Sequence, residues 1–199
     1  MGHYKNFTVD FPRRLRDLDQ QFRPIASAAD LDVSYVLMKL AAAFLLPYER
    51  LTGTSGARAT DLDPNQRQSI RRVLELDKRF FQASYCGDRT EWFSLEVENF
   101  MRGPKDWQGA ERGLESPAHE VLETIRHSVA HSNLFFGGER RIEHIYLGSR
   151  MERLPDTGRY RVIRCTVNEL GHLVDAWIRN VQKLRVSPAL IWRELEAAA

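Results

Sequence analysis

An arginine and two histidines stand within six residues of one another in the stretch Ile125 to Asn133, which reads Ile-Arg-His-Ser-Val-Ala-His-Ser-Asn. Histidine gains and loses a proton near neutral pH, and arginine keeps its charge and grips phosphate oxygens with a planar fork. Arg126, His127 and His131 therefore supply the groups that metal-free cleavage of a phosphodiester needs: a base for the attacking hydroxyl, an acid for the leaving oxygen and a cation for the phosphorane.

The spacing of apolar residues predicts the helix that must position these three side chains. It runs from Pro117 to about Ser132, and Ser116 with Pro117 gives the N-cap and first-turn proline of its start. At about 100° per residue, its apolar residues fall on one stripe that must face the core: Ala118, Val121, Leu122, Ile125 and Val129. His127 and His131 lie nearly opposite this stripe. Arg126 projects roughly 140° around from His131, so a second copy across a two-fold axis is needed to bring such groups into one cleft.

Two other interpretations of this helix face stay open. A polar helix face is often simply solvated. Alternatively, Glu123, His127 and His131 follow one another at four-residue intervals, and such an arrangement would suit a helical metal-binding protein. The sequence offers no evident fourth ligand, so we expect neither a metal ion nor another cofactor here.

Two further arginines stand close to these residues in the sequence. Arg140 and Arg141 follow Gly137-Gly138, which we interpret as a turn, and they are the preferred local contacts to phosphate. The two glycines do not resemble a phosphate-binding loop, because no Gly-Lys-Ser/Thr sequence follows them.

Helical periodicity dominates the rest of the chain and predicts a mainly α fold. Apolar spacing favours helices over residues 11–23, 31–51, 64 to about 87, and 90–101. A β-hairpin is expected from residues 141–148 and 159–166, which are rich in β-branched and aromatic residues. Thr166 and Glu169 have the spacing of a capping box for the last long helix, whose apolar stripe includes Trp177.

These patterns predict a single domain over residues 1–199, a helical bundle with one small β-hairpin before the last long helix. Residues 102–115 contain three glycines and a proline, and we expect them to form a mobile connection. Pro188 is expected to begin a short C-terminal helix over residues 188–197.

Composition narrows the class of protein. The net charge is only +2, so contact with a polyanion must come from a local patch. Cys86 and Cys165 form neither a disulfide framework nor a metal-binding pattern, and we expect reduced thiols. The chain starts without a signal-peptide pattern, and its most apolar stretch, residues 33–47, is too short to span a bilayer and contains Lys39. The expected location is cytoplasmic, without membrane contact.

The run from Arg126 to His131 fits the Arg-x-x-x-x-His motif of the HEPN superfamily, in which a polar residue commonly follows the arginine. The phrase IRHSVAHSN, with a short strand expected after it, resembles the LRNALAHGN-type signature of a plasmid- and bacteria-borne HEPN branch. The following hairpin and a closing helix with Trp177 extend the resemblance over residues 116–184. The chain differs from the common pattern at His127, where asparagine or aspartate is frequent, and at Ser132, where glycine is usual.

This resemblance implies an all-α bundle that dimerises through its motif helices and, in active members, a metal-independent endoribonuclease of toxin–antitoxin or defence systems. It implies that Arg126 binds the scissile phosphate, that His131 is the general base or acid, and that His127 is a second proton carrier or orienting group. Ser132 and Asn133 follow the motif, and the resemblance implies that they support substrate binding. The implied partners are RNA, a second copy of the chain, and an antitoxin or other defence-system protein. The alternative is a non-catalytic HEPN module that binds RNA or a protein partner.

Overall fold

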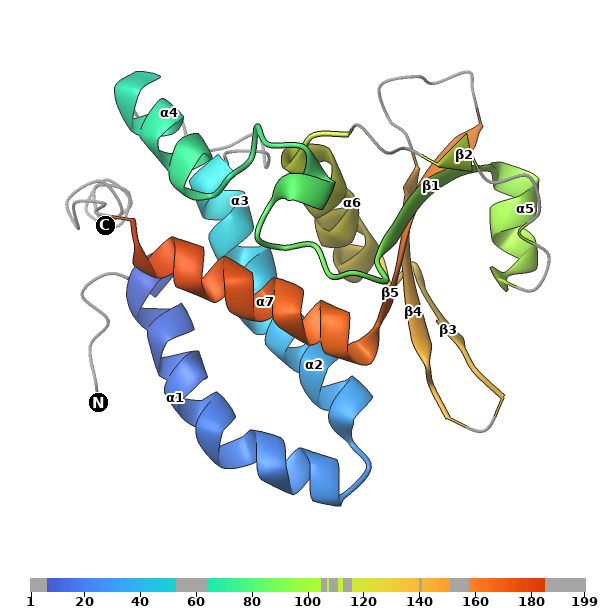
Figure 1. The fold of residues 1–199 in the computed structure, drawn as a ribbon, viewed down its shortest axis with the longest axis horizontal. Coiled ribbons are helices and arrows are strands. Elements are labelled where there is room, and N and C mark those ends of the chain that lie inside the picture. The colour runs from blue at the N-terminus through green and yellow to red at the C-terminus, as the bar shows by residue number, and fades with distance from the viewer. Residues whose placement is uncertain are drawn as a thin grey trace, which may run out of the picture. The chain divides into compact units, whose positions relative to one another are not determined.

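A computed structural model describes residues 7–52, 64–104, 107, 111–112, 116–139, 141–150 and 158–184. The chain divides into two compact units, of which the first combines Met1–Glu75 with Val174–Ala199 and the second is the continuous stretch Leu76–Leu173. Figure 1 shows the helices of the first unit and the sheet of the second. The single-domain organisation stays a prediction, and the helix expected over residues 188–197 lies outside the described residues.

The described part of the first unit is helical. Its elements are α1 (Phe7–Ala28), α2 (Asp32–Leu40), the π-helical segment η1 (Ala41–Leu45), α3 (Leu46–Thr52), α4 (Pro64–Val73) and the second half of α7 (Val167–Gln182). Trp177 of α7 is fully buried here, with its ring centroid 4.9 Å from that of Phe44 and 5.7 Å from that of Tyr48. Its indole nitrogen donates a hydrogen bond to the carbonyl of Ala43 at 3.0 Å. The prediction that Trp177 belongs to the core is confirmed.

A buried lysine with polar partners joins α1, α2 and α7 within the first unit. Lys39 is 1% exposed, and its Nζ lies 2.8 Å from Oδ1 of Asp19 and 2.5 Å from Oδ1 of Asp175. Arg23 pairs with Oδ2 of the same two carboxylates, at 2.7 and 3.2 Å. The hydroxyl of Tyr35 donates to Oδ1 of Asp19 at 2.9 Å. The lysine is therefore buried together with the opposite charges that make such burial tolerable.

The second unit contains a five-stranded antiparallel sheet with the strand order β2-β1-β5-β4-β3. The strands are β1 (Glu91–Glu96), β2 (Glu111–Arg112), β3 (Leu134–Gly137), β4 (His144–Arg150) and β5 (Arg159–Thr166). The predicted hairpin corresponds to the β4–β5 pair, in which Leu147 lies opposite Ile163. The short strand expected after the motif is β3. This sheet is the support against which the motif helix packs.

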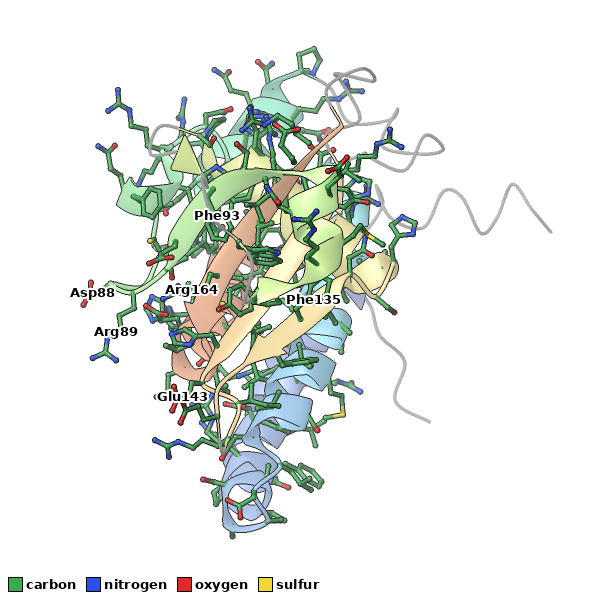
Figure 2. The ribbon with its side chains drawn as sticks, turned by 90° about the vertical axis from the view of Figure 1, so that its right-hand side faces the viewer. Asp88, Arg89, Phe93, Phe135, Glu143 and Arg164 are labelled. Carbon is green, nitrogen blue, oxygen red and sulfur yellow. The ribbon has the colours of Figure 1, made fainter. Side chains whose placement is uncertain are left out.

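Helices lie on opposite faces of this sheet (Figure 1). On one face, α6 (Ala118–Ala130) packs against β4 and β5. On the other face, α5 (Val97–Arg102) places Phe100 over the sheet, where its ring stacks on Tyr160 at 4.0 Å. Phe93, Leu95, Phe100 and Val162 form a buried cluster on this second face, and Trp107 packs against it. Figure 2 looks toward this face, with Phe93, Phe135 and Arg164 labelled.

The prediction of a mainly α bundle with one small hairpin is therefore wrong, because the protein is α+β. Residues 90–101, predicted as one helix, form β1 followed by the short α5. Trp92 and Phe93 are adjacent in β1 and both are buried, so the alternation typical of a half-exposed strand holds only from Phe93 to Glu96. Part of the stretch 102–115, expected as a mobile connection, also belongs to the fold, since β2 pairs with β1.

Two predicted helix boundaries are also corrected. The helix from Pro64 ends at Val73, well before residue 87, and Glu75 follows in a left-handed conformation with φ of 50°. Phe80, within the predicted range, is buried and lies in a short 3-10 turn. The motif helix begins at Ala118 with Pro117 as its N-cap, without a side-chain cap from residue 116.

The capping box at the start of α7 is confirmed. The backbone N–H of Thr166 donates to Oε2 of Glu169 at 2.8 Å, and the N–H of Glu169 donates to Oγ1 of Thr166 at 3.2 Å.

In the ranges that the structure describes, none of the helices is long and apolar enough to cross a membrane.

Candidate functional site

The inner face of α6 fixes the helix on the sheet. Its fully buried apolar side chains are Ala118, Val121, Leu122 and Ile125. Ser128 is also buried, and its hydroxyl donates to the carbonyl of Thr124 at 2.6 Å. Val129, predicted to share the stripe, is only half-buried. At its first turn, α6 is held by an ion pair of 3.0 Å between Glu120 and Arg161 of β5.

The motif side chains form a row along α6, in which Arg126 and His127 are half-buried and His131 is exposed. Nη2 of Arg126 lies 2.6 Å from Nε2 of His127. The same Nε2 lies 4.0 Å from Oε1 of Glu123, one helical turn earlier. The rings of His127 and His131 are nearly parallel, with centroids 6.0 Å apart and an interplanar angle of 14°. The structure thus brings Arg126, His127 and His131 together, although the helical wheel separated Arg126 from His131.

The contact between Arg126 and His127 assigns a protonation state to this histidine. A guanidinium group has only donors, so Nε2 of His127 must accept the hydrogen bond from Arg126. The imidazole in this contact is therefore neutral, with its proton on Nδ1.

His131 lies at the point where α6 ends. It is the C-cap residue and is exposed, while Ser132 follows with a positive φ of 57°. The N–H of Ser132 donates to the carbonyl of Val129 at 3.4 Å, and the N–H of Asn133 donates to the carbonyl of Ser128 at 2.9 Å. These two bonds make a Schellman motif, which usually has glycine at the position of Ser132. This Schellman motif holds His131 at the end of α6.

We predict that Ser132→Gly raises the free energy of unfolding by about 0.5–1 kcal/mol. In the left-handed conformation serine has a steric penalty that glycine avoids. The stabilisation from removing this penalty is larger than the destabilisation from the extra conformational entropy of glycine in the unfolded chain. Urea titration followed by circular dichroism measures the change. The matched control is Ala130→Gly in the last turn of α6, which should lower the free energy of unfolding by a similar amount. Equal destabilisation by both substitutions would contradict the prediction.

The other predicted substrate-binding residues are placed differently. Asn133 is half-buried, and its carbonyl accepts a hydrogen bond from the N–H of Gly148 at 3.2 Å, so its backbone joins α6 to the sheet. Arg141 is exposed in the connection between β3 and β4, and the four residues of β3, about 13 Å of strand, separate it from Asn133. The structure therefore does not bring Arg141 to the motif. Arg140 lies outside the described residues.

In the described part of the chain, no group of three or more His, Cys, Asp or Glu residues is arranged to hold a metal ion. Glu123, His127 and His131 therefore do not form such a group. Cys86 and Cys165 are free thiols. Burial raises the pKa of Cys86 to about 11 and raises the pKa of Cys165 still further. Both therefore stay protonated near neutral pH and are poor nucleophiles.

Sequence reasoning found these residues but missed the contact between Arg126 and His127. Adjacent helical residues project about 100° apart and are not expected to face each other. The arginine side chain is long enough to turn back along the helix surface, and this spans the angle. The chain matches no protein-family model, no curated protein and no solved structure.

Proposed function

We propose that this protein is a metal-independent endoribonuclease. The observation that carries the proposal is the row of Arg126, His127 and His131 along α6, in which a guanidinium group, a neutral imidazole and an exposed imidazole succeed one another. These are the groups that RNA transesterification needs. The resemblance of the motif to the HEPN superfamily points to the same activity.

In the proposed reaction, the 2′-oxygen of a ribose attacks the neighbouring phosphorus, and the bond from phosphorus to the 5′-oxygen breaks. One histidine accepts the proton of the 2′-hydroxyl, and a protonated histidine donates a proton to the departing 5′-oxygen. Arg126 stabilises the charge that develops on the phosphorane oxygens. The products are a 2′,3′-cyclic phosphate and a free 5′-hydroxyl.

The contact between Arg126 and His127 suggests how the site responds to substrate. A phosphate group is a stronger acceptor for guanidinium than a neutral imidazole. Binding of RNA would therefore draw Arg126 from His127 and release Nε2 of His127 to accept a proton. The exposed His131 would serve as the acid, and a second copy of the chain would complete the cleft, as the resemblance to the HEPN superfamily implies.

We predict that the purified protein cleaves single-stranded RNA in the presence of EDTA. The experiment uses a labelled oligonucleotide of mixed sequence, and mass spectrometry of the fragments should show 2′,3′-cyclic phosphate ends. A matched DNA oligonucleotide should remain intact, because it lacks the attacking hydroxyl. Cleavage that EDTA abolishes would overturn the metal-free mechanism. Retention of RNA without any cleavage would overturn the enzyme proposal in favour of an RNA-binding module.

A further inference from the structure

A row of four side chains crosses the sheet from β1 to β3 on the face that carries α5. Residues that lie directly opposite each other on neighbouring strands point to the same face. Glu91 of β1 lies opposite Arg164 of β5, and Arg164 lies opposite Tyr146 of β4. Tyr146 in turn lies opposite Phe135 of β3. We call these four residues the sheet row, and Figure 2 looks onto this face with Arg164 and Phe135 labelled.

The sheet row keeps part of its surface in solvent, unlike the neighbouring part of the same face. In that neighbouring part, Phe93, Phe100 of α5 and Val162 belong to the buried cluster. In the sheet row all four residues are only half-buried, and the side chains of Arg164 and Glu91 are 34% and 36% exposed. The row is therefore accessible to a ligand beside the cluster.

Two buried hydrogen-bond donors meet at this row without an acceptor. Nε of Arg164 and Nε1 of Trp107 are shielded from water and have no hydrogen-bond partner in the part of the chain that the structure describes. Both residues adjoin Tyr146, since Arg164 is its partner across the strands and the ring centroid of Trp107 is 4.9 Å from that of Tyr146. Such donors are costly to bury, and native proteins seldom leave them unpaired. A ligand with acceptor atoms beside Tyr146 would pair them.

The chemistry of the sheet row indicates the class of ligand. The half-buried rings of Tyr146 and Phe135 favour a planar ring as their partner. Nη1 of Arg164 lies 3.4 Å from Oε2 of Glu91, so these two charges offset each other and the row favours an uncharged acceptor over a phosphate group. A nucleobase combines a planar ring with uncharged acceptor atoms. Proteins bind unpaired bases of single strands on aromatic rings and guanidinium groups in this way.

The sheet row also ends close to the motif along the chain. Phe135 follows His131 by four residues, which span at most about 14 Å. Its strand, β3, is the last in the order of the sheet. A strand of RNA that contacts the motif can therefore pass round this edge and reach the opposite face of the sheet.

From these observations, we propose that the sheet row binds an unpaired base of an RNA strand. The proposal rests on the proposed function only in taking RNA as the ligand. It adds a contact to RNA on the face of the sheet opposite α6, away from the reacting groups. This contact contributes to the affinity for RNA and not to the chemical step.

Binding of RNA that cannot be cleaved tests this proposal. A labelled 2′-O-methyl hexauridine lacks the attacking hydroxyl, and fluorescence anisotropy should show that the wild-type protein binds it. Arg164→Met keeps the length of the side chain but removes its donors, and it should weaken binding about tenfold. The matched control, Arg150→Met, removes the same charge from an exposed position on the same face and should leave the affinity within about threefold.

A second set of variants separates stacking on the base from loss of packing. Tyr146→Leu should weaken binding about tenfold, whereas Tyr146→Phe keeps the ring and should stay within about threefold of the wild type. Phe136→Leu, at an exposed position that points to the other face of β3, should also stay within this limit. A hexamer of the same length with abasic sites in place of its central bases should bind the wild-type protein at least tenfold more weakly.

Crosslinking of the wild-type protein covers the case in which these variants fail to fold. A 2′-O-methyl hexamer that contains 4-thiouridine should crosslink on irradiation to Tyr146, Phe135 or Trp107, as mass spectrometry of the peptides would show. Crosslinks confined to other elements, equal binding of the abasic hexamer, or equal losses in Arg164→Met and Arg150→Met would overturn the proposal. Uridine monophosphate that binds as tightly as the hexamer would overturn RNA as the source of the base. None of these results depends on cleavage, so failure of this proposal and failure of the proposed ribonuclease are distinguishable.

Discussion

His131→Ala is expected to reduce the rate of RNA cleavage about 10²- to 10⁴-fold, because a positioned acid or base contributes an effect of this size. Arg126→Ala is expected to reduce it about 10²- to 10³-fold through the loss of charge stabilisation on the phosphorane. His131 is exposed, so His131→Ala should change the melting temperature little; Arg126 is half-buried, so the melting temperature of Arg126→Ala is measured beside its rate. Single-turnover rates with saturating protein in EDTA measure the chemical step for each variant.

Two matched controls separate a role in the reaction from loss of positive charge on the surface. Arg141→Ala removes an exposed arginine beyond β3, and His172→Ala removes an exposed histidine of α7; each should leave the rate within about threefold. Arg126→Lys keeps the charge but loses the planar fork, so it should recover only part of the rate. A similar loss in Arg141→Ala and Arg126→Ala would contradict the assigned role of Arg126.

The motif helix and its support were predictable because local signals agree with the final structure. The apolar spacing from Ala118 to Ile125 places α6, and the capping box of Thr166 and Glu169 starts α7 where the sequence indicates. Both signals act within a few residues along the chain. They therefore do not depend on which distant segment packs against the helix.

The sheet was not predictable in full, because β1 and β2 are defined by pairing rather than by local pattern. β1 pairs with β5 over its whole length, and its adjacent buried residues Trp92 and Phe93 break the strict alternation of a strand, so a helical period fits its sequence as well as a strand period. β2 is only two residues long and has no pattern of its own. Its existence depends on the neighbouring β1.

Within the candidate site, residue types were predictable and distances were not. The two histidines share a face because four-residue spacing dictates it. The contact of Arg126 with His127 depends on the torsion angles of a long side chain, which spacing does not determine. Arg141 is near the motif in sequence but is separated from it by β3, because an extended strand advances about 3.3 Å per residue.

Lys39→Met is expected to lower the free energy of unfolding by about 3–5 kcal/mol, the effect of removing one partner from a buried ion pair. The substitution keeps the volume of the side chain but leaves Asp19 and Asp175 close together without the ammonium group between them. The matched control is Arg23→Met, whose side chain is 52% exposed, and its cost should stay below about 1 kcal/mol. Urea denaturation at neutral pH measures both. Equal decreases in the free energy of unfolding for Lys39→Met and Arg23→Met would contradict the prediction that the buried lysine contributes most to the stability of this cluster.

The same cluster predicts how stability depends on acid. Burial by itself raises the pKa of Asp19, but hydrogen bonds from Lys39 and Tyr35 and the nearby positive charges outweigh it, and the pKa is lowered from the ordinary value of 3.8. A carboxyl whose pKa is lower in the folded state contributes stability above its unfolded pKa and loses it as the pH falls through the folded pKa. The wild-type protein should therefore lose stability as the pH falls below about 3.8. In Lys39→Met the pKa of Asp19 is no longer held down, so this loss should shrink, and the difference between the two proteins should narrow in acid. If the difference in free energy of unfolding between wild type and Lys39→Met stays constant from neutral pH into acid, the proposed coupling between Lys39 and Asp19 is contradicted.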